Sequence, residues 1–257
     1  MRLLFILAAS FFLPLALTHA EPATPTDAAW LQQRGTLIFH DAFERDEDGN
    51  LAAAIGNGWN SATANRVPKI KQADLDGGIL KISSATVEAK HAAHIHHEAG
   101  FSDGGAVVRF RFPGLSPKES LQLGFVDREL KGVHAGHLCY GILGTVPPTI
   151  TLIDHKTGIM NLANQKRRDD VQAKKEKIPA DLEKLLAAKK AVVPWKPDHE
   201  WHELVLVTES DEMRLSLDGH VLAKHRSEGF AHPMKRWFSF LVSSTVWIDD
   251  VKIWRVK

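Results

Sequence analysis

Two groups of histidines are the residues of this sequence most suited to chemistry. The chain has 14 histidines. His94 and His96 stand out in one group, and His134 and His137 form the other. An imidazole exchanges protons near neutral pH, and paired imidazoles bind zinc or copper. If the first group lies in a strand, His94 and His96 share one face. We take these four, with Asp127 as a nearby carboxylate, as candidate catalytic residues. The alternative is a set of half-exposed histidines on a solvated sheet face.

One tryptophan and two arginines are the candidate ligand-binding residues. An indole ring offers a flat apolar surface on which a sugar can stack. Trp195 follows a polar segment and stands between prolines, so we expect it to be exposed, the alternative being that it packs. Arg109 and Arg111 alternate with apolar residues and therefore lie on the polar face of their strand. Trp237 has apolar neighbours and is expected in the core.

The elements that must position these residues are short apolar runs, which recur about every ten residues. This spacing is typical of an antiparallel sandwich or jelly roll, and alternating β-α units would be spaced differently. The clearest runs form hairpins over 201–223 and a closing strand over 246–254. The sequence therefore predicts an all-β fold, an antiparallel β-sandwich (jelly roll) with a short helical insertion.

The closing strand contains a change of side-chain alternation. Val246 and Ile248 share one parity, whereas Val251 and Ile253 share the other. Because the side chains of a strand alternate with a period of two, the change predicts a β-bulge at Asp249-Asp250.

The segment from about 161 to 193 departs from the strand pattern. It holds nine Lys/Arg and five Asp/Glu residues, a net charge of +4. Pro179 suits the start of a helix, and Leu182, Leu185 and Leu186 follow helical spacing. We predict a helical insertion, which is either a solvated excursion between strands or a basic lid over a binding face. A basic lid would favour an acidic glycan.

The N-terminal residues predict export. Arg2 precedes an apolar run that ends at Leu17, and small residues follow it. This is the pattern of a signal peptide over 1–20, so we expect a periplasmic or secreted protein. Residues 21–36 are rich in Pro and Thr and are expected to form a flexible leader, and 37–257 are expected to form one domain.

The composition excludes several partners. Lys plus Arg (32) nearly balances Asp plus Glu (31), so no overall field favours nucleic acid. Beyond the N-terminal run, no segment reaches the roughly 20 apolar residues that a membrane-spanning helix needs. The single cysteine, Cys139, allows no intramolecular disulfide and is expected in a buried strand.

The sequence resembles the concanavalin A-like lectin/glucanase superfamily, the jelly roll of laminin G-like modules, legume lectins and many glycan-acting enzymes. It is also distantly similar to secreted bacterial proteins of the 3-keto-disaccharide hydrolase type. The resemblance spans most of 37–256 and rests on five segments: Asp41-Ala42-Phe43, Gly56-Asn57-Gly58-Trp59, Trp201-His202, Leu215-Ser216-Leu217-Asp218-Gly219 and Ile248-Asp249-Asp250-Val251-Lys252-Ile253-Trp254.

The resemblance implies a carbohydrate partner and, in many such modules, a structural calcium ion between the first and last strands. Asp41 and Asp250 match these positions and are the candidate metal ligands, because calcium prefers oxygen donors. The alternative is that both are solvated. Glucanases on this fold carry Glu-x-Asp-x-x-Glu on one strand. That order is absent here, and the nearest match, 198–203, is expected to be scaffold.

Three functions remain open at this point. The first is a glycan-binding module of unknown sugar specificity, and the second is a carbohydrate-active hydrolase or lyase that uses a histidine with an aspartate. The third is a structural or interaction module without sugar contact. Convergence of the four histidines in a cleft beside a carboxylate would favour the enzyme, whereas a flat face lined by Trp195 would favour the binding module.

Overall fold

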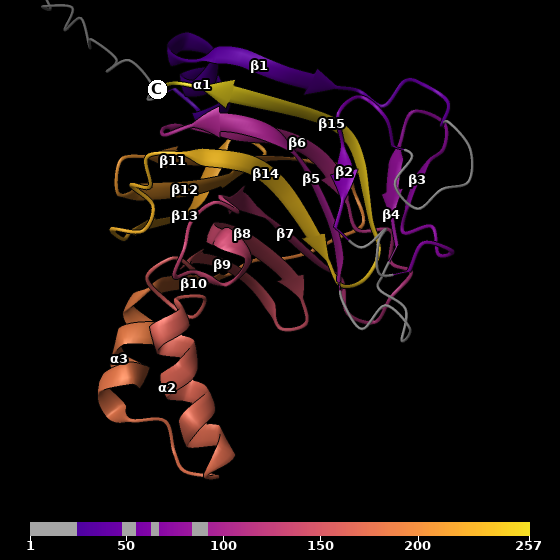
Figure 1. Ribbon diagram of the computed structural model, residues 1–257. Helices are drawn as coiled ribbons and strands as arrows, with labels where there is room; N and C mark the ends of the chain where they lie inside the picture. Colours follow the sequence, from indigo (N-terminus) through magenta and orange to yellow (C-terminus); the bar gives the residue numbers. More distant parts are fainter. Residues whose placement is uncertain (1–24, 48–54, 63–66, 84–91) are drawn as a thin grey trace, which may run out of the picture.

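The computed structural model describes residues 25–47, 55–62, 67–83 and 92–257. Over these residues the chain forms two antiparallel sheets packed face to face, with an N-terminal helix and a helical hairpin outside them (Figure 1). The predicted all-β sandwich with a helical insertion is therefore confirmed. The predicted signal peptide over 1–20 lies outside the described residues.

The first sheet has eight strands in the order β13-β12-β11-β6-β15-β4-β3, and β1 also pairs with β15. The predicted C-terminal hairpins and closing strand all belong to it. Its strands are β1 (Thr36–Asp41), β3 (Ala73–Leu75), β4 (Leu80–Ile82), β6 (Gly104–Arg111), β11 (His202–Glu209), β12 (Glu212–Leu217), β13 (His220–Arg226) and β15 (Val246–Arg255).

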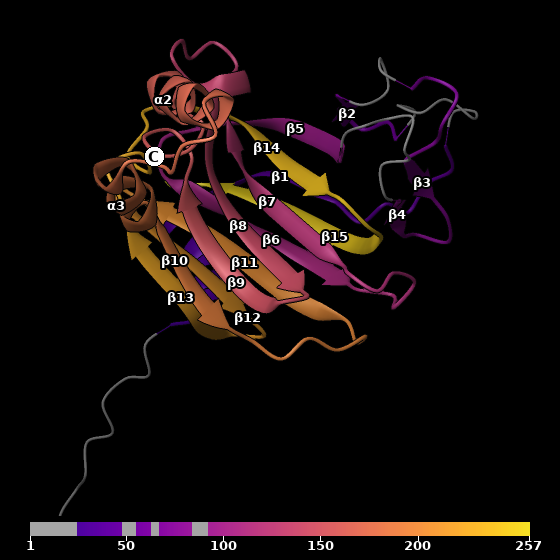
Figure 2. The same ribbon diagram turned by 90° about the horizontal axis from the view of Figure 1, so that it is seen from below.

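The second sheet has seven strands in the order β10-β9-β8-β7-β14-β5-β2. Figure 2 shows β14, β7, β8 and β9 side by side. Its strands are β2 (Asn60–Ser61), β5 (Ala93–Phe101), β7 (Ser120–Val126), β8 (His137–Thr145), β9 (Pro148–Asp154), β10 (Lys190–Pro194) and β14 (Lys235–Val242).

The core lies between the two sheets. Phe238 and Phe240 of the seven-stranded sheet and Val108 and Phe110 of the eight-stranded sheet are all fully buried. Alternate residues of the same strands therefore point to the outer faces. Cys139 is fully buried as predicted, and burial raises the pKa of its thiol to about 12, so it remains a protonated core residue at neutral pH.

The predicted β-bulge is present in β15. Ile248 pairs with Phe110 and Asp250 pairs with Arg109, which leaves Asp249 as the extra residue. The Asp249 carboxylate forms an ion pair with Arg109 on the outer face of the eight-stranded sheet. The bulge therefore places the Asp249 carboxylate where it can form an ion pair with Arg109 on the neighbouring strand β6.

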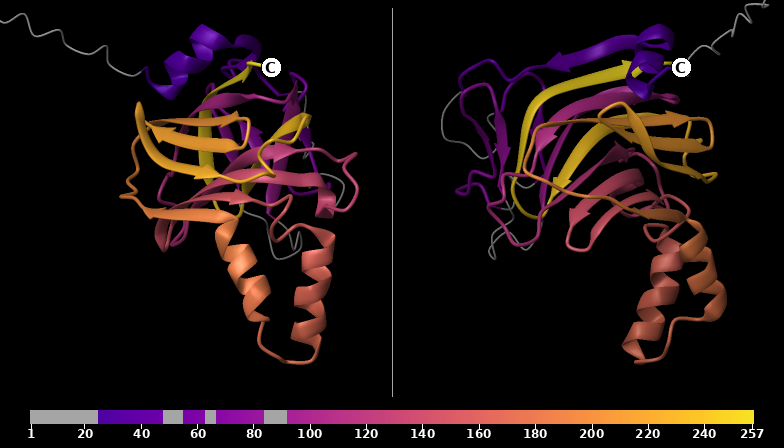
Figure 3. Two further views of the ribbon diagram at one scale, coloured as in Figure 1. Left: turned by 90° about the vertical axis from the view of Figure 1, so that its left-hand side faces the viewer. Right: turned by 180° about the vertical axis from the view of Figure 1, so that it is seen from behind.

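The insertion forms a helical hairpin of α2 (Leu162–Ala173) and α3 (Ala180–Ala188). Residues 190–193, which were expected to belong to it, instead begin the edge strand β10. Leu182 is buried, whereas α2 has no buried residue. The hairpin projects away from both sheets (Figures 1 and 3), so it does not form the basic lid considered as one alternative.

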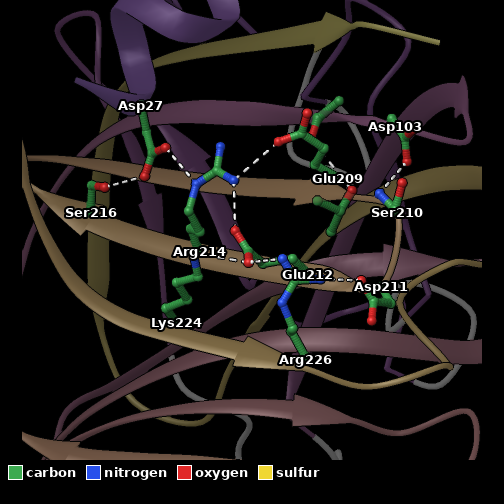
Figure 4. Close-up of polar contacts among 12 residues, drawn as sticks. Asp27, Asp103, Glu209, Ser210, Asp211, Glu212, Arg214, Ser216, Lys224 and Arg226 are labelled. Carbon is green, nitrogen blue, oxygen red and sulfur yellow. Dashed lines mark hydrogen bonds and ion pairs between the residues drawn. The ribbon is translucent and has the colours of Figure 1, made fainter. Parts of the chain in front are cut away.

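The N-terminal segment corrects the predicted flexible leader, because residues 27–34 form helix α1 (Asp27–Arg34), which the Thr26 side chain caps. The Asp27 carboxylate accepts hydrogen bonds from Arg214 and Ser216 of β12 (Figure 4). Leu31 is buried against the outer face of the eight-stranded sheet. The helix is thus fixed to the domain by the ion pair with Arg214, the hydrogen bond with Ser216 and apolar packing around Leu31.

Among the described residues, none of the helices combines the length and the apolar character that crossing a lipid bilayer requires.

Candidate functional site

The four predicted histidines converge on the outer face of the seven-stranded sheet. His94 and His96 project from β5 with ring centroids 5.6 Å apart. His137 begins β8 and stacks with His94 at 5.8 Å. His134, in the 3-10 turn before β8, stacks with His137 at 6.4 Å. The sequence placed these residues together correctly, and their participation in catalysis stays a prediction.

The contact between His94 and His137 shows that their side chains lean toward each other. Two strands, β7 and β14, separate β8 from β5, so the two backbones are about 14 Å apart at the usual strand spacing. The residues between them are small, since Gly124 and Ser239 occupy the outer face of β7 and β14. A Cβ at position 124 would lie 2.7 Å from the Tyr140 ring, so only glycine allows Tyr140 to lie across β7.

Tyr140 and His155 complete this group, which we call the histidine cluster: His94, His96, His134, His137, Tyr140 and His155. The Tyr140 hydroxyl is hydrogen-bonded to His137 Nδ1 at 2.7 Å and to Ser239 Oγ at 3.1 Å. The His155 ring packs against Tyr140 at 5.2 Å and against His137 at 6.2 Å. In the sequence, Tyr140 directly follows Cys139, which was predicted to be buried. Because successive side chains of a strand point to opposite faces, this position was the signal that Tyr140 faces outward.

Two imidazoles of the cluster are neutral at neutral pH. Burial, followed by the charges of Arg128 and His97, lowers the pKa of His96 to about 4. Burial and the neighbouring His137 lower the pKa of His155 to about 3. A neutral imidazole has one donor and one acceptor nitrogen. Such groups suit hydroxyl-rich ligands better than charged ones.

A pocket of about 460 Å³ adjoins the cluster, and we call it the Trp237 pocket. The His96 ring contacts Trp237 edge-on at 5.1 Å, so this tryptophan joins the two features. The pocket is formed by the ends of β5 and β14, by one residue of β1 and by the loops after β7 and before β14. Its lining residues are Ile38, His97, Glu98, Ala99, Gly100, Glu129, Met234, Arg236 and Trp237.

The expectation that Trp237 lies in the core is wrong. Its side chain is half-buried and faces the pocket, whereas Phe238 and Phe240 are the core residues of β14. The apolar neighbours of Trp237 in the sequence suggested burial, whereas the alternation of side chains along β14 indicates the opposite face. Phe238 and Phe240 share one parity, so Trp237 and Ser239 must point to the other face.

The Asp127 carboxylate is bonded to residues outside the histidine cluster. It accepts hydrogen bonds from His232 Nε2 at 3.0 Å, from Arg236 Nε at 2.9 Å and from the Glu129 backbone amide at 3.1 Å. Burial alone would raise the pKa of Asp127, but these hydrogen bonds lower it below its usual value. Asp127 therefore stays ionised and fixes Arg236 at the pocket wall.

Arg109 and Arg111 lie on the outer face of the other sheet. Their guanidinium carbons sit 4.8 Å from the Trp201 ring centroid and 5.0 Å from the Trp247 ring centroid, respectively. The core of the sandwich separates them from the histidine cluster. The structure therefore does not bring these candidate substrate-binding residues together with the candidate catalytic ones.

Trp195 is not the exposed platform that its sequence position suggested. It is half-buried, and its indole Nε1 donates a hydrogen bond to the Gly144 carbonyl at 2.8 Å. Its ring packs against Phe112 with centroids 6.2 Å apart. These contacts correspond to the packing alternative.

The structure does not bring the candidate calcium ligands Asp41 and Asp250 together. Asp41 lies opposite Val251 and faces the interior, whereas Asp250, one residue earlier in β15, faces outward. Asp41 accepts hydrogen bonds from Arg45 at 2.6 Å and from Trp59 at 2.8 Å. Asp250 is bonded to His40 and Lys252. Within the described ranges, no group of three or more His, Cys, Asp or Glu residues is placed to hold a metal ion.

Comparisons with known proteins identify the fold. No protein-family model and no curated protein matches the sequence. The endo-β-1,3(4)-glucanase SCLam of family GH16 superposes with a TM-score of 0.55 over 92% of this chain and 95% of its own, at 12% identity. The laminarinase from Rhodothermus marinus gives 0.56 over 86% and 97%, at 12% identity. The laminarinase from Flavobacterium sp. UMI-01 gives 0.54 over 86% and 100%, at 11% identity. The chain thus has the concanavalin A-like jelly-roll fold.

Proposed function

We propose that this chain binds a carbohydrate on the outer face of the seven-stranded sheet. The Trp237 pocket would take one sugar ring, and the histidine cluster would contact its neighbours. The observation that carries the proposal is a pocket of about 460 Å³ that lies directly beside the cluster and has a half-buried indole in its wall. Its volume is in the range of small-molecule sites, about 300–1,000 Å³.

The lining residues provide what a sugar ring needs. An indole stacks on the apolar C–H face of a pyranose. Arg236 supplies guanidinium donors in a fixed orientation, because Asp127 and Glu129 hold it at 2.9 and 2.6 Å. Glu98 and Glu129 offer carboxylate acceptors for hydroxyl groups. A stacking surface flanked by oriented polar groups is the usual composition of a sugar subsite.

The fold comparison suggests the first ligand class to test. A crystal structure of a variant of the SCLam glucanase has a 1,3-β-D-cellobiosyl-glucose at its active site. That protein is 12% identical to this chain, so the similarity supports β-glucans only as a starting panel. Acidic glycans belong on the same panel.

A glycan array followed by titration calorimetry tests the proposal. We expect Trp237→Ala to weaken binding by about tenfold or more, which corresponds to about 1.4 kcal/mol of lost stacking. Trp201→Ala is the matched control, because Trp201 is also half-buried beside an arginine but lies on the other sheet. It should bind as the wild type does. Equal affinity for wild type and Trp237→Ala would contradict the proposal.

A hydrolase or lyase is the second candidate function. Two carboxylates, Glu98 and Glu129, line the same pocket, and paired carboxylates can act as acid and base on a glycosidic bond. The neutral His96 stands beside that pocket. A reducing-sugar assay on the array ligands distinguishes the two candidates. Release that Glu98→Gln abolishes would favour the enzyme, and binding without release would favour the binding module.

A further inference from the structure

The loop that follows β7 carries a cation without a carboxylate partner. Arg128 is exposed, and among the described residues it makes no ion pair. The carboxylates on either side of it in sequence, Asp127 and Glu129, both bind Arg236. Arg236 of β14 therefore has two carboxylate partners, while Arg128 keeps its full charge at the surface.

Two uncharged groups hold Arg128 in place. One guanidinium nitrogen lies 3.3 Å from His96 Nδ1, and the guanidinium carbon lies 5.7 Å from the Trp237 ring centroid, within the range of a cation–π contact. Because an arginine can only donate, His96 Nδ1 is the acceptor, and the imidazole proton lies on Nε2. The guanidinium is thus oriented without being neutralised.

The position of Arg128 joins the two parts of the candidate site. His96 belongs to the histidine cluster and Trp237 to the pocket, so a ligand that extends from one to the other passes Arg128. An oriented guanidinium binds a carboxylate or a sulfate through two parallel hydrogen bonds. Because the side chain is already held in place, less conformational entropy is lost when the ligand binds.

We propose that Arg128 binds the anionic group of an acidic carbohydrate, either the carboxylate of a uronic acid or a sulfate ester. This inference rests on the proposed carbohydrate binding and specifies its substrate class. Arg128 determines specificity, whereas Trp237 supplies affinity for any ring of suitable shape.

The test compares each acidic oligosaccharide with its neutral counterpart by calorimetry. The probes are an oligogalacturonate with its methyl ester and a sulfated galactan oligosaccharide with its desulfated form. The wild type should bind at least one acidic probe about tenfold more tightly than its neutral form. Arg128→Gln should remove this preference while affinity for the neutral form changes less than twofold. Arg128→Lys should keep part of the preference, because lysine retains the positive charge but lacks the two parallel N–H donors of a guanidinium.

Arg111→Gln is the matched control, since Arg111 also lies over a tryptophan, on the opposite sheet. It should keep the wild-type preference. Equal binding of acidic and neutral probes by the wild type, or an unchanged preference in Arg128→Gln, would overturn the inference. If neutral probes still bind through Trp237, the proposed function stands and only this inference fails. If the wild type binds none of the array glycans or these probes, both fail.

Discussion

The outer faces of the two sheets both carry arginines and aromatic residues, but the partners of these arginines differ. On the eight-stranded sheet, Arg214 binds Asp27, Glu209 and Glu212 (Figure 4). On the seven-stranded sheet, Arg128 is held by an imidazole and an indole ring. The first arrangement is neutralised within the protein. The second leaves its charge available to a ligand.

The comparison indicates how a face with a structural role differs from the proposed binding face. The network around Arg214 is covered in part by α1 and fixes that helix to β12. The seven-stranded sheet instead has a pocket beside the neutral imidazole of His96. Aromatic and cationic residues occur on both faces, so residue type alone does not reveal which one binds.

Gly124→Ala should give the largest effect and should act on the proposed binding face. The added Cβ would meet the Tyr140 ring and the Cys139 carbonyl, and such overpacking costs about 3 kcal/mol of unfolding free energy. Binding should fall as well, because Tyr140 supports His137. Gly144→Ala in β8 is the control, since its nearest neighbour would be 3.4 Å away. Chemical denaturation measures both, and equal stability of the two variants would contradict the packing described above.

Glu212→Ala should lower stability without changing ligand binding. Glu212 is 5% exposed and pairs with three cations, Arg214, Lys224 and Arg226. Because two of these cations are largely exposed, we expect a loss of about 2 kcal/mol, between the values for surface and buried pairs. Thermal unfolding and calorimetry measure the two effects. A tenfold loss of glycan affinity in this variant would contradict the assignment of a purely structural role to the outer face of the eight-stranded sheet.

His202 should make the eight-stranded sheet pH-sensitive. Burial alone would lower the pKa of His202, but hydrogen bonds with Asp218 and Asp198, both 2.7 Å away, raise it above its usual value. The stabilisation is therefore complete below the unfolded-state pKa of about 6.5 and is lost as pH rises through the higher folded-state pKa. We expect about 1 kcal/mol.

Unfolding of the wild type and of His202→Gln should be followed between pH 5 and about pH 9, which spans the ordinary imidazole pKa. The difference in stability between the two proteins should shrink as pH rises. A difference that grows with pH would show that His202 is neutral in the folded protein.

Asp249→Asn should give the smallest effect. Its ion pair with Arg109 is partly exposed, and such pairs contribute about 0.5 kcal/mol. Glycan affinity should be unchanged, because this pair lies on the structural face. Thermal unfolding and calorimetry would measure both quantities, and a change in affinity would return Arg109 to the binding residues.

The fold could be read from the sequence because alternation survives in long, half-buried strands. The parity change around Asp249-Asp250 predicted the bulge, and the two-residue spacing of His94 and His96 placed them on one face. The same rule, applied to Phe238 and Phe240, would have moved Trp237 out of the core. The alternation around Trp237 is therefore a signal that the sequence contains.

Other features had no local signal. Helix α1 is short and is fixed by Asp27, whose partner Arg214 is 187 residues away. Arg128 depends on a loop conformation that places it over Trp237. Asp41 and Asp250 lie on neighbouring strands as the resemblance implied, but the strand register turns them to opposite sides. Pairings of this kind are set by the tertiary structure.

The most direct test of the account is an NMR titration that follows the tryptophan indole N–H resonances as a binding oligosaccharide is added. The seven tryptophans are assigned by single substitution. We predict a saturable shift of the Trp237 resonance, with those of Trp201 and Trp247 unchanged. A shift of Trp201 or Trp247 with Trp237 unchanged would place the ligand on the eight-stranded sheet and contradict the account.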